Sequence, residues 1–149
     1  MENLNATLDR NVKTAINYLK YIAAGTGSEG RVAFDKAFSL VADDFEIDVM
    51  PSSLKMPKMT QKPYRAWLEP MVKDLFVSFE AHVIQTTAQD NRAVIEAESS
   101  ARTADGRDYG QQYFIAFEFN EAGKIKRVKE YTDSLYSSRF YTKQDRPKS

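Results

Sequence analysis

The hydrophobic periodicity of this chain changes once, near Phe79, and the change restricts the folds available to it. Before Phe79, apolar residues recur at spacings of three and four, which is typical of amphipathic helices. After it, apolar and polar residues alternate, which is typical of half-buried strands. Three helical segments and one strand, followed by four consecutive strands, predict an α+β domain. We expect a curved antiparallel sheet that wraps around about three N-terminal helices.

The element boundaries are predicted from residues that disfavour or cap a helix. Residues 25–27 (GTG) end the first helix, and Ser28 is placed to cap the second. Thr60 caps the third, which has Pro63 in its first turn, and Pro70 should kink or break it. Strands are predicted at residues 45–49, 79–87, 94–103, 109–119 and 124–132.

Two segments lack a regular pattern. Residues 50–60 contain two prolines and three methionines, so we predict a loop that either lines a ligand site or folds over the end of the core. Residues 137–149 are polar and basic and are expected to form a loose tail. Because no linker or repeat divides the chain, residues 1–149 are interpreted as a single domain.

Composition argues against several classes of function. The chain has 21 basic and 21 acidic residues, so no net field favours nucleic acid or an anionic membrane. It has no cysteine and one histidine, His82, and it lacks a glycine-rich phosphate loop, so we expect no metal and no cofactor. The opening residues do not resemble a secretion signal, and no apolar run is long enough to span a membrane. A cytoplasmic protein is therefore expected.

The C-terminal half carries a pattern that resembles a known family. Residues 106–119 (GRDYGQQYFIAFEF), 123–125 (GKI) and 130–133 (EYTD) resemble the SnoaL-like group of the nuclear transport factor 2-like superfamily. Residues 51–57 (PSSLKMP) further resemble fungal members found in secondary-metabolite pathways. The resemblance implies a cone with an internal pocket and a homodimer. It also implies an isomerase or cyclase that acts on a hydrophobic, oxygenated small molecule; the alternatives are a non-catalytic binding or dimerisation module, a dehydratase or an epoxide hydrolase.

The resemblance also implies which side chains face the pocket. Placing Gly106 and Gly123 on the equivalent turns of ketosteroid isomerase, a relative, puts Ile115 where that enzyme has its oxyanion-binding acid and Val49 near its general base. Steroid isomerisation by the same residues is therefore not expected. A single β-bulge would invert part of the assignment. The inward rows implied are Glu96, Glu98, Ser100 and Arg102; Gln111, Tyr113, Ile115 and Phe117; and Val128, Glu130 and Thr132.

Glu130 and Tyr113 form the main catalytic pair of the hypothesis. Both are expected inward on adjacent strands, where a carboxyl group and a phenol can contact one ligand. Enclosure among apolar residues should raise the pKa of Glu130 toward the range useful for proton transfer. The alternative is that Glu130 pairs with a basic neighbour and only stabilises the sheet.

The other candidates each have a structural alternative. Tyr109 either donates a hydrogen bond to a substrate carbonyl or covers its hairpin. Glu98 and Arg102 either assist catalysis, with Arg102 polarising a carbonyl, or form an interior salt bridge. Asp133 either contacts substrate or caps a turn. His82 is retained as a ligand contact, although we favour a structural or surface role. The full set of expected substrate contacts is Trp67, Tyr64, Met71, Ile115, Phe117, Val128, Ser100, His82 and Asp133, of which the first three at helical spacing would alternatively be plain core.

Overall fold

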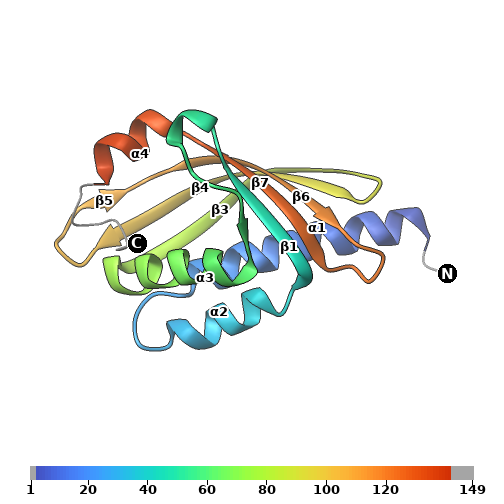
Figure 1. The fold of residues 1–149 in the computed structure, drawn as a ribbon, viewed down its shortest axis with the longest axis horizontal. Coiled ribbons are helices and arrows are strands. Elements are labelled where there is room, and N and C mark those ends of the chain that lie inside the picture. The colour runs from blue at the N-terminus through green and yellow to red at the C-terminus, as the bar shows by residue number, and fades with distance from the viewer. Residues whose placement is uncertain (1–2, 142–149) are drawn as a thin grey trace.

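A curled sheet with helices against its concave side makes up the part of the chain described by the computed structural model, residues 3–141 (Figure 1). The α+β architecture expected from the change in periodicity is confirmed. The helices are α1 (Leu4–Ala23), α2 (Gly30–Phe38), α3 (Gln61–Pro70) and α4 (Ser134–Phe140), with a 3₁₀ turn at Ser52–Leu54 and a π-helical turn at Met71–Leu75. The strands are β1 (Val41–Met50), β2 (Met59–Thr60), β3 (Phe76–Gln89), β4 (Arg92–Thr103), β5 (Asp108–Tyr109), β6 (Gln112–Phe119) and β7 (Ile125–Thr132).

The sheet order is β2-β1-β7-β6-β4-β3, with β5 paired to β4. The four C-terminal strands β3, β4, β6 and β7 therefore form the antiparallel meander that the sequence predicts. The sheet is not antiparallel throughout, because β1 runs parallel to β7, with Ile47 opposite Val128. Alternation along 45–49 identifies a strand, but it carries no information about the direction of a neighbour that lies far away in sequence.

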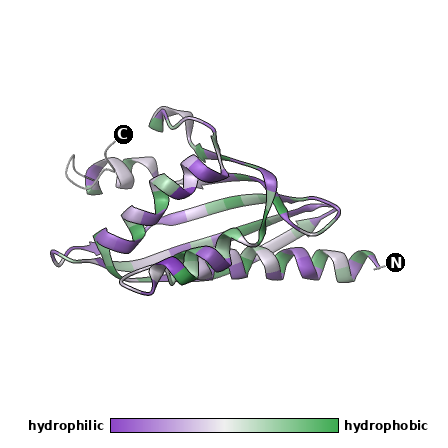
Figure 2. Ribbon diagram, turned by 60° about the horizontal axis from the view of Figure 1, so that its bottom comes forward, coloured by the Kyte–Doolittle hydropathy of each residue, from purple (hydrophilic) through white to green (hydrophobic). Residues whose placement is uncertain are grey.

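The helices bury their apolar sides against the concave face of the sheet. Helix α1 packs along β3 and β4, and Figure 2 shows hydrophobic and hydrophilic residues alternating along this long helix next to the N-terminus. Aromatic side chains pack inside the cone, where Tyr18 contacts Phe38 and Phe117 edge to face at 6.4 and 5.9 Å between ring centroids.

Several helix boundaries match the sequence expectations and one does not. Thr60 occupies the N-cap position of α3, although its side chain makes no capping hydrogen bond, and the regular α-helix ends at Pro70, where the backbone continues as the π-helical turn. Ser28 is not the cap of α2, because that helix starts two residues later at Gly30, preceded by Glu29.

The C-terminal expectation is wrong for residues 137–140. They belong to helix α4, which starts because the Asp133 carboxylate accepts a hydrogen bond from the Tyr136 amide at 3.0 Å. Residues 142–149 lie outside the described part of the chain. The strand predicted at 109–119 is interrupted at Gly110 and Gln111, so that β5 and β6 are separate.

Among the described residues, no helix combines the length and apolar character needed to cross a membrane.

Candidate active site

A cavity of about 390 Å³ lies between the concave face of the sheet and the helices. Its walls come from α1, α3, the Met71–Leu75 turn, all of the C-terminal strands and α4. Most of the lining is apolar or aromatic, with a few convergent polar groups, as in sites for small organic ligands. Leu54 and Met56 also line it, which supports the site-lining alternative for the loop at 50–60.

Glu130 projects into this cavity from the middle of β7. Its side chain keeps intermediate accessibility because it faces the cavity, while protein atoms enclose it on the other sides. Desolvation raises the pKa of Glu130 from its ordinary value of 4.5 to about 7. No ion pair of Glu130 is formed with any described residue, so the alternative of a sheet-stabilising salt bridge is not supported. Near neutral pH this carboxyl group is able both to give and to take a proton.

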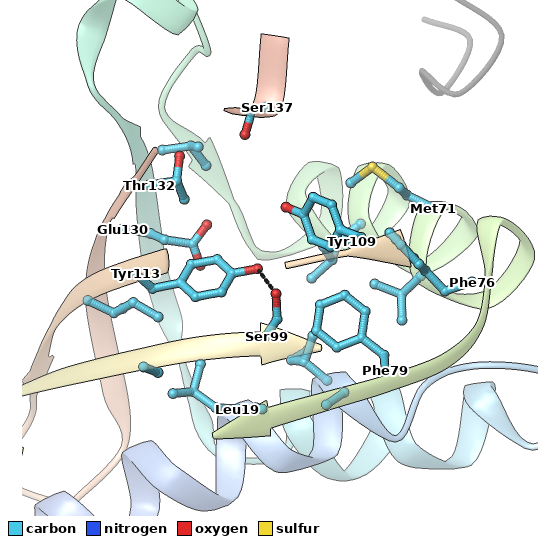
Figure 3. Close-up of a pocket in the computed structure, with 18 of the residues that line it drawn as sticks. Leu19, Met71, Phe76, Phe79, Ser99, Tyr109, Tyr113, Glu130, Thr132 and Ser137 are labelled. Carbon is cyan, nitrogen blue, oxygen red and sulfur yellow. Dashed lines mark hydrogen bonds between the residues drawn. The ribbon is translucent and has the colours of Figure 1, made fainter. Parts of the chain in front are cut away.

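Tyr113 lies beside Glu130 on the neighbouring strand β6, and its phenol points into the same space (Figure 3). Its hydroxyl is 3.2 Å from the Ser99 hydroxyl. The Ser99 oxygen also accepts a hydrogen bond from the backbone N–H of Gln111 at 3.1 Å. Burial, followed by the nearby Tyr109 and Glu130, raises the pKa of Tyr113 well above its ordinary value. The phenol therefore stays protonated at neutral pH and can donate a hydrogen bond to a ligand.

Tyr109 covers its hairpin, the structural alternative, and its hydroxyl also reaches the cavity. Its ring packs against Phe76, Tyr136 and Phe140, at 4.6 Å between centroids for Phe140, and so joins α4 to the sheet. Its hydroxyl is directed into the cavity in Figure 3, and burial raises its pKa. Tyr109 is thus placed as a second neutral hydrogen-bond donor near the mouth.

Strand β4 faces the opposite way from the expected register. The buried row consists of Ala97, Ser99, Ala101 and Thr103, whereas the side chains of Glu98, Ser100 and Arg102 are exposed, and Glu96 lies on the same outer face. Ala97 is the cross-strand partner of Tyr113, so these two residues share the inner face. The residues themselves held the correct signal: the alternation along 93–103 places most of the apolar residues on one side and all of the charged residues on the other.

This correction removes two expected catalytic residues from the interior. Arg102 points outward and donates to Asp108 at 2.7 Å, so it does not reach a substrate carbonyl. Glu98 is also exposed and touches the cavity only at its rim. The expected interior salt bridge between Glu98 and Arg102 is not formed. Ser100 lies on the same outer face and is removed from the substrate contacts.

The remaining expected contacts divide into two groups. Trp67, Tyr64, Met71 and Ile115 line the cavity, as does Thr132 from the predicted inward row. The inward direction of Gln111, Phe117 and Val128 is also confirmed, but Phe117 and Val128 pack in the core and do not line the cavity.

Two expected contacts lie outside the cavity. The His82 side chain is 54% exposed, on the outer face of β3, with its Nε2 3.6 Å from Glu80, so the surface role that we favoured fits. Asp133 is exposed and caps α4, so the capping alternative holds.

Sequence reasoning missed several lining residues, among them Ser99, Ser137 and Tyr18, which carry hydroxyl groups. Ser99 was assigned to the outer face by the borrowed register. Ser137 was placed in a loose tail, although Asp133 followed by an apolar residue at 135 is a helix-start signal. Tyr18 falls between Ala15 and Ile22 on the buried stripe of α1, and its position was a usable signal. Its buried hydroxyl interacts with that of Tyr64.

No group of three or more histidine, cysteine, aspartate or glutamate side chains gathers in a geometry suited to a metal ion within residues 3–141.

Comparisons with known proteins place the fold. No family model matches the sequence, and no curated protein matches it either. Solved structures do: the BvnE pinacolase from Penicillium brevicompactum is 20% identical, with a TM-score of 0.78 and 93% of each chain covered. A protein from Jannaschia sp. CCS1, provisionally described as a SnoaL-like polyketide cyclase, is 12% identical, with a TM-score of 0.70 and coverage of 93% of this chain and 95% of that chain. An LEH-like epoxide hydrolase from M. tuberculosis is 13% identical, with a TM-score of 0.68 and 89% of each chain covered.

The chain therefore has the nuclear transport factor 2-like cone fold, as the resemblance implied. At these identities the likeness establishes the fold alone. Solved structures with this fold include enzymes that act on small molecules, among them the pinacolase and the epoxide hydrolase.

Proposed function

We propose that this protein is an isomerase or cyclase that rearranges a hydrophobic, oxygenated small molecule by general acid-base catalysis, without a cofactor. The observation that carries the proposal is the position of Glu130, a carboxyl group enclosed in an apolar cavity with its pKa raised to about 7. A group whose pKa lies near the working pH is the most efficient proton-transfer catalyst. The occurrence of small-molecule enzymes among the solved structures with this fold supports the same conclusion.

In this proposal Glu130 moves a proton on the substrate, while Tyr113 and Tyr109 donate hydrogen bonds to the substrate oxygen. Ser99 holds the Tyr113 hydroxyl, since its own oxygen is fixed by the Gln111 amide. Donors held in place before the reaction stabilise negative charge as it develops on oxygen, with no reorganisation during the step. Arg102 and Glu98 have no part in the mechanism, because neither faces the interior.

The lining favours this chemistry over epoxide hydrolysis by an Asp-Arg-Asp arrangement. Within the described residues, neither arginine nor aspartate lines the cavity. The walls instead offer one enclosed carboxyl group and several hydroxyl groups, which suit proton transfer at a carbonyl or hydroxyl carbon.

The proposal is tested by proton exchange, which does not require the natural substrate. Decalone, a bicyclic ketone, is incubated with the protein in D₂O, and deuterium incorporation next to its carbonyl is followed by mass spectrometry. Glu130→Gln keeps the size of the side chain and removes its acid-base function, so the catalysed exchange is expected to fall by about 10²- to 10⁴-fold. Glu118→Gln, the same change at a residue that does not line the cavity, should exchange like the wild type.

Two outcomes would oppose the proposal in different ways. Exchange that is unchanged in Glu130→Gln would remove Glu130 from the mechanism. Binding of ketones without any exchange in the wild type would favour a non-catalytic binding module. Binding is measurable because Trp67, the single tryptophan of the sequence, lines the cavity and should change its fluorescence when a ligand enters.

A further inference from the structure

The charges around the cavity are of one sign. Among the described residues that line it, Glu130 and the rim residue Glu98 are the charged groups, and no lysine, arginine or histidine lines it. An adjoining hollow at the mouth is lined by Glu98 and Asp133 and again by no basic residue within the described chain. A ligand with a carboxylate or phosphate group would therefore find no countercharge along this route.

Two arginines on elements that line the cavity, one on α3 and one on β4, are engaged elsewhere. Arg65, next to the lining residue Tyr64 in sequence, bonds Asp35 at 2.6 Å and Glu69 at 3.0 Å. Arg102 bonds Asp108 at 2.7 Å on the outer face. Neither side chain is free to turn toward Glu130 without losing these partners. The carboxylate form of Glu130 therefore has no cation from the described protein, although an enclosed charge normally requires one.

Aromatic rings from α3 and from strands β3 and β5 form a large part of the cavity wall. Tyr64 and Trp67 from α3 stack at an interplanar angle of 26°, and Phe76 and Phe79 from β3 meet edge to face at 86°. Tyr109 completes this group near the mouth. The face of an aromatic ring carries negative electrostatic potential, and several such faces around one carboxylate form a site suited to organic ammonium groups.

We propose that the ligand of this cavity carries a cationic nitrogen, which pairs with the Glu130 carboxylate and packs against the aromatic wall. The proposal rests on the proposed function, because it takes the Glu130 cavity as the reaction site. It narrows the oxygenated substrate to one that also contains a protonated amine or a comparable cationic nitrogen, and it excludes acidic substrates.

The groups that face Glu130 do not titrate near neutral pH, so an effect of pH on ligand binding reports the charge of Glu130. The phenols of Tyr18, Tyr64, Tyr109 and Tyr113 surround it from α1, α3, β5 and β6, and burial raises the pKa of each, so all four stay neutral. Within this cluster of Glu130 and the four phenols, Glu130 is therefore the group that should change charge near neutral pH. Glu98 at the rim is exposed to solvent.

The test uses three compounds that share one skeleton and differ in charge: adamantylmethylamine, adamantylmethanol and adamantane carboxylic acid. Affinity is measured through Trp67 fluorescence at about pH 8, where the Glu130 carboxyl group is mostly ionised and the probe amine is protonated. The amine should bind at least about tenfold more tightly than the alcohol, and the acid more weakly than both. Lowering the pH to about 6 protonates Glu130, so the preference for the amine should shrink about tenfold while the alcohol is little affected.

The variants separate this inference from the proposed function. Glu130→Gln should abolish the preference for the amine at about pH 8, and Glu118→Gln should keep it. If the alcohol binds as tightly as the amine in the wild type, the cationic ligand is excluded while the acid-base proposal stands. A preference for the amine that persists in Glu130→Gln also contradicts this inference, because the ammonium group would then pair with a residue other than Glu130. If none of the three compounds binds, both this inference and the proposed function fail, since both require an open cavity.

Discussion

At the scale of single residues, the main finding is a glutamate whose surroundings rather than its neighbours in sequence determine its chemistry. Glu130 lies between two exposed residues of β7, Lys129 and Tyr131, so its local sequence suggests a solvated strand. The curl of the sheet instead turns it into an apolar cavity, where desolvation disfavours the carboxylate.

This desolvation should make the folded protein less stable as the pH rises. The pKa of Glu130 is about 7 when folded against an ordinary 4.5, so between these values the folded state binds more protons than the unfolded state. The stabilising effect of the protonated group is complete below about pH 4.5 and is lost as the pH rises through 7. We expect about 2 kcal/mol less stability from this group at pH 8 than at pH 5.

Urea unfolding at the two pH values measures this difference, and Glu130→Gln provides the control. The glutamine side chain at position 130 carries no charge at either pH, so the stability of this variant should depend less on pH than that of the wild type. Identical pH dependence in both proteins would show that the Glu130 pKa is not raised.

At the scale of elements, a buried glutamine holds α4 over the mouth of the cavity. The side-chain nitrogen of Gln111, Nε2, donates to the backbone carbonyl of Asp133 at 3.2 Å and to the Ser137 hydroxyl at 2.7 Å. Its carbonyl oxygen accepts from the Gln112 and Asp133 amides at 2.8 and 3.0 Å. One side chain thereby connects the break between β5 and β6 to the start of α4, and it pairs backbone groups of Gln112 and Asp133.

Replacing Gln111 with leucine should destabilise the protein by about 2 to 3 kcal/mol, because it leaves several of these groups unpaired. The loss should be accompanied by faster amide hydrogen exchange in α4 than in β6 and β7. Gln112→Leu is the matched control, since Gln112 is exposed and its side chain makes none of these bonds. Equal destabilisation by both changes, or unchanged exchange in α4, would contradict this role.

At the scale of the whole molecule, the outer face of the sheet carries exposed apolar side chains. Phe114 is 53% exposed, and its cross-strand partner Tyr131 is 44% exposed. Ile84 on β3 is 54% exposed. Apolar groups that adjoin on a folded surface often mark a contact with another protein. We propose that this face joins two copies of the chain in a homodimer.

Light scattering coupled to size-exclusion chromatography should therefore give twice the chain mass of 17.0 kDa. Phe114→Glu should yield the monomer, because a charge would be buried in the contact. Val32→Glu, at a residue on α2 with a similar exposure of 53%, should leave the dimer intact. A monomeric wild type would refute the proposal.

The inward direction of Tyr113 and Glu130 was implied by the resemblance to a known family, whereas the sequence itself was sufficient for the α+β class, the meander and the break at Pro70. These features depend on local periodicity and on residues such as proline whose backbone limits act within a few positions. The same local rules pointed to the inner face of β4, where the apolar row of alanines and Ile95 is buried, but a register taken from a relative overrode them.

The tertiary structure decided what local patterns do not encode. It placed β1 parallel to β7, brought Ser99 to Tyr113, and left Arg102 on the outside with Asp108. It also enclosed Glu130 in the cavity, where burial raises its pKa, with no cation beside it within the described chain, and this second feature leads to the ligand that we infer. Each of these facts depends on residues that are distant in sequence, and contact and desolvation are properties of the folded chain.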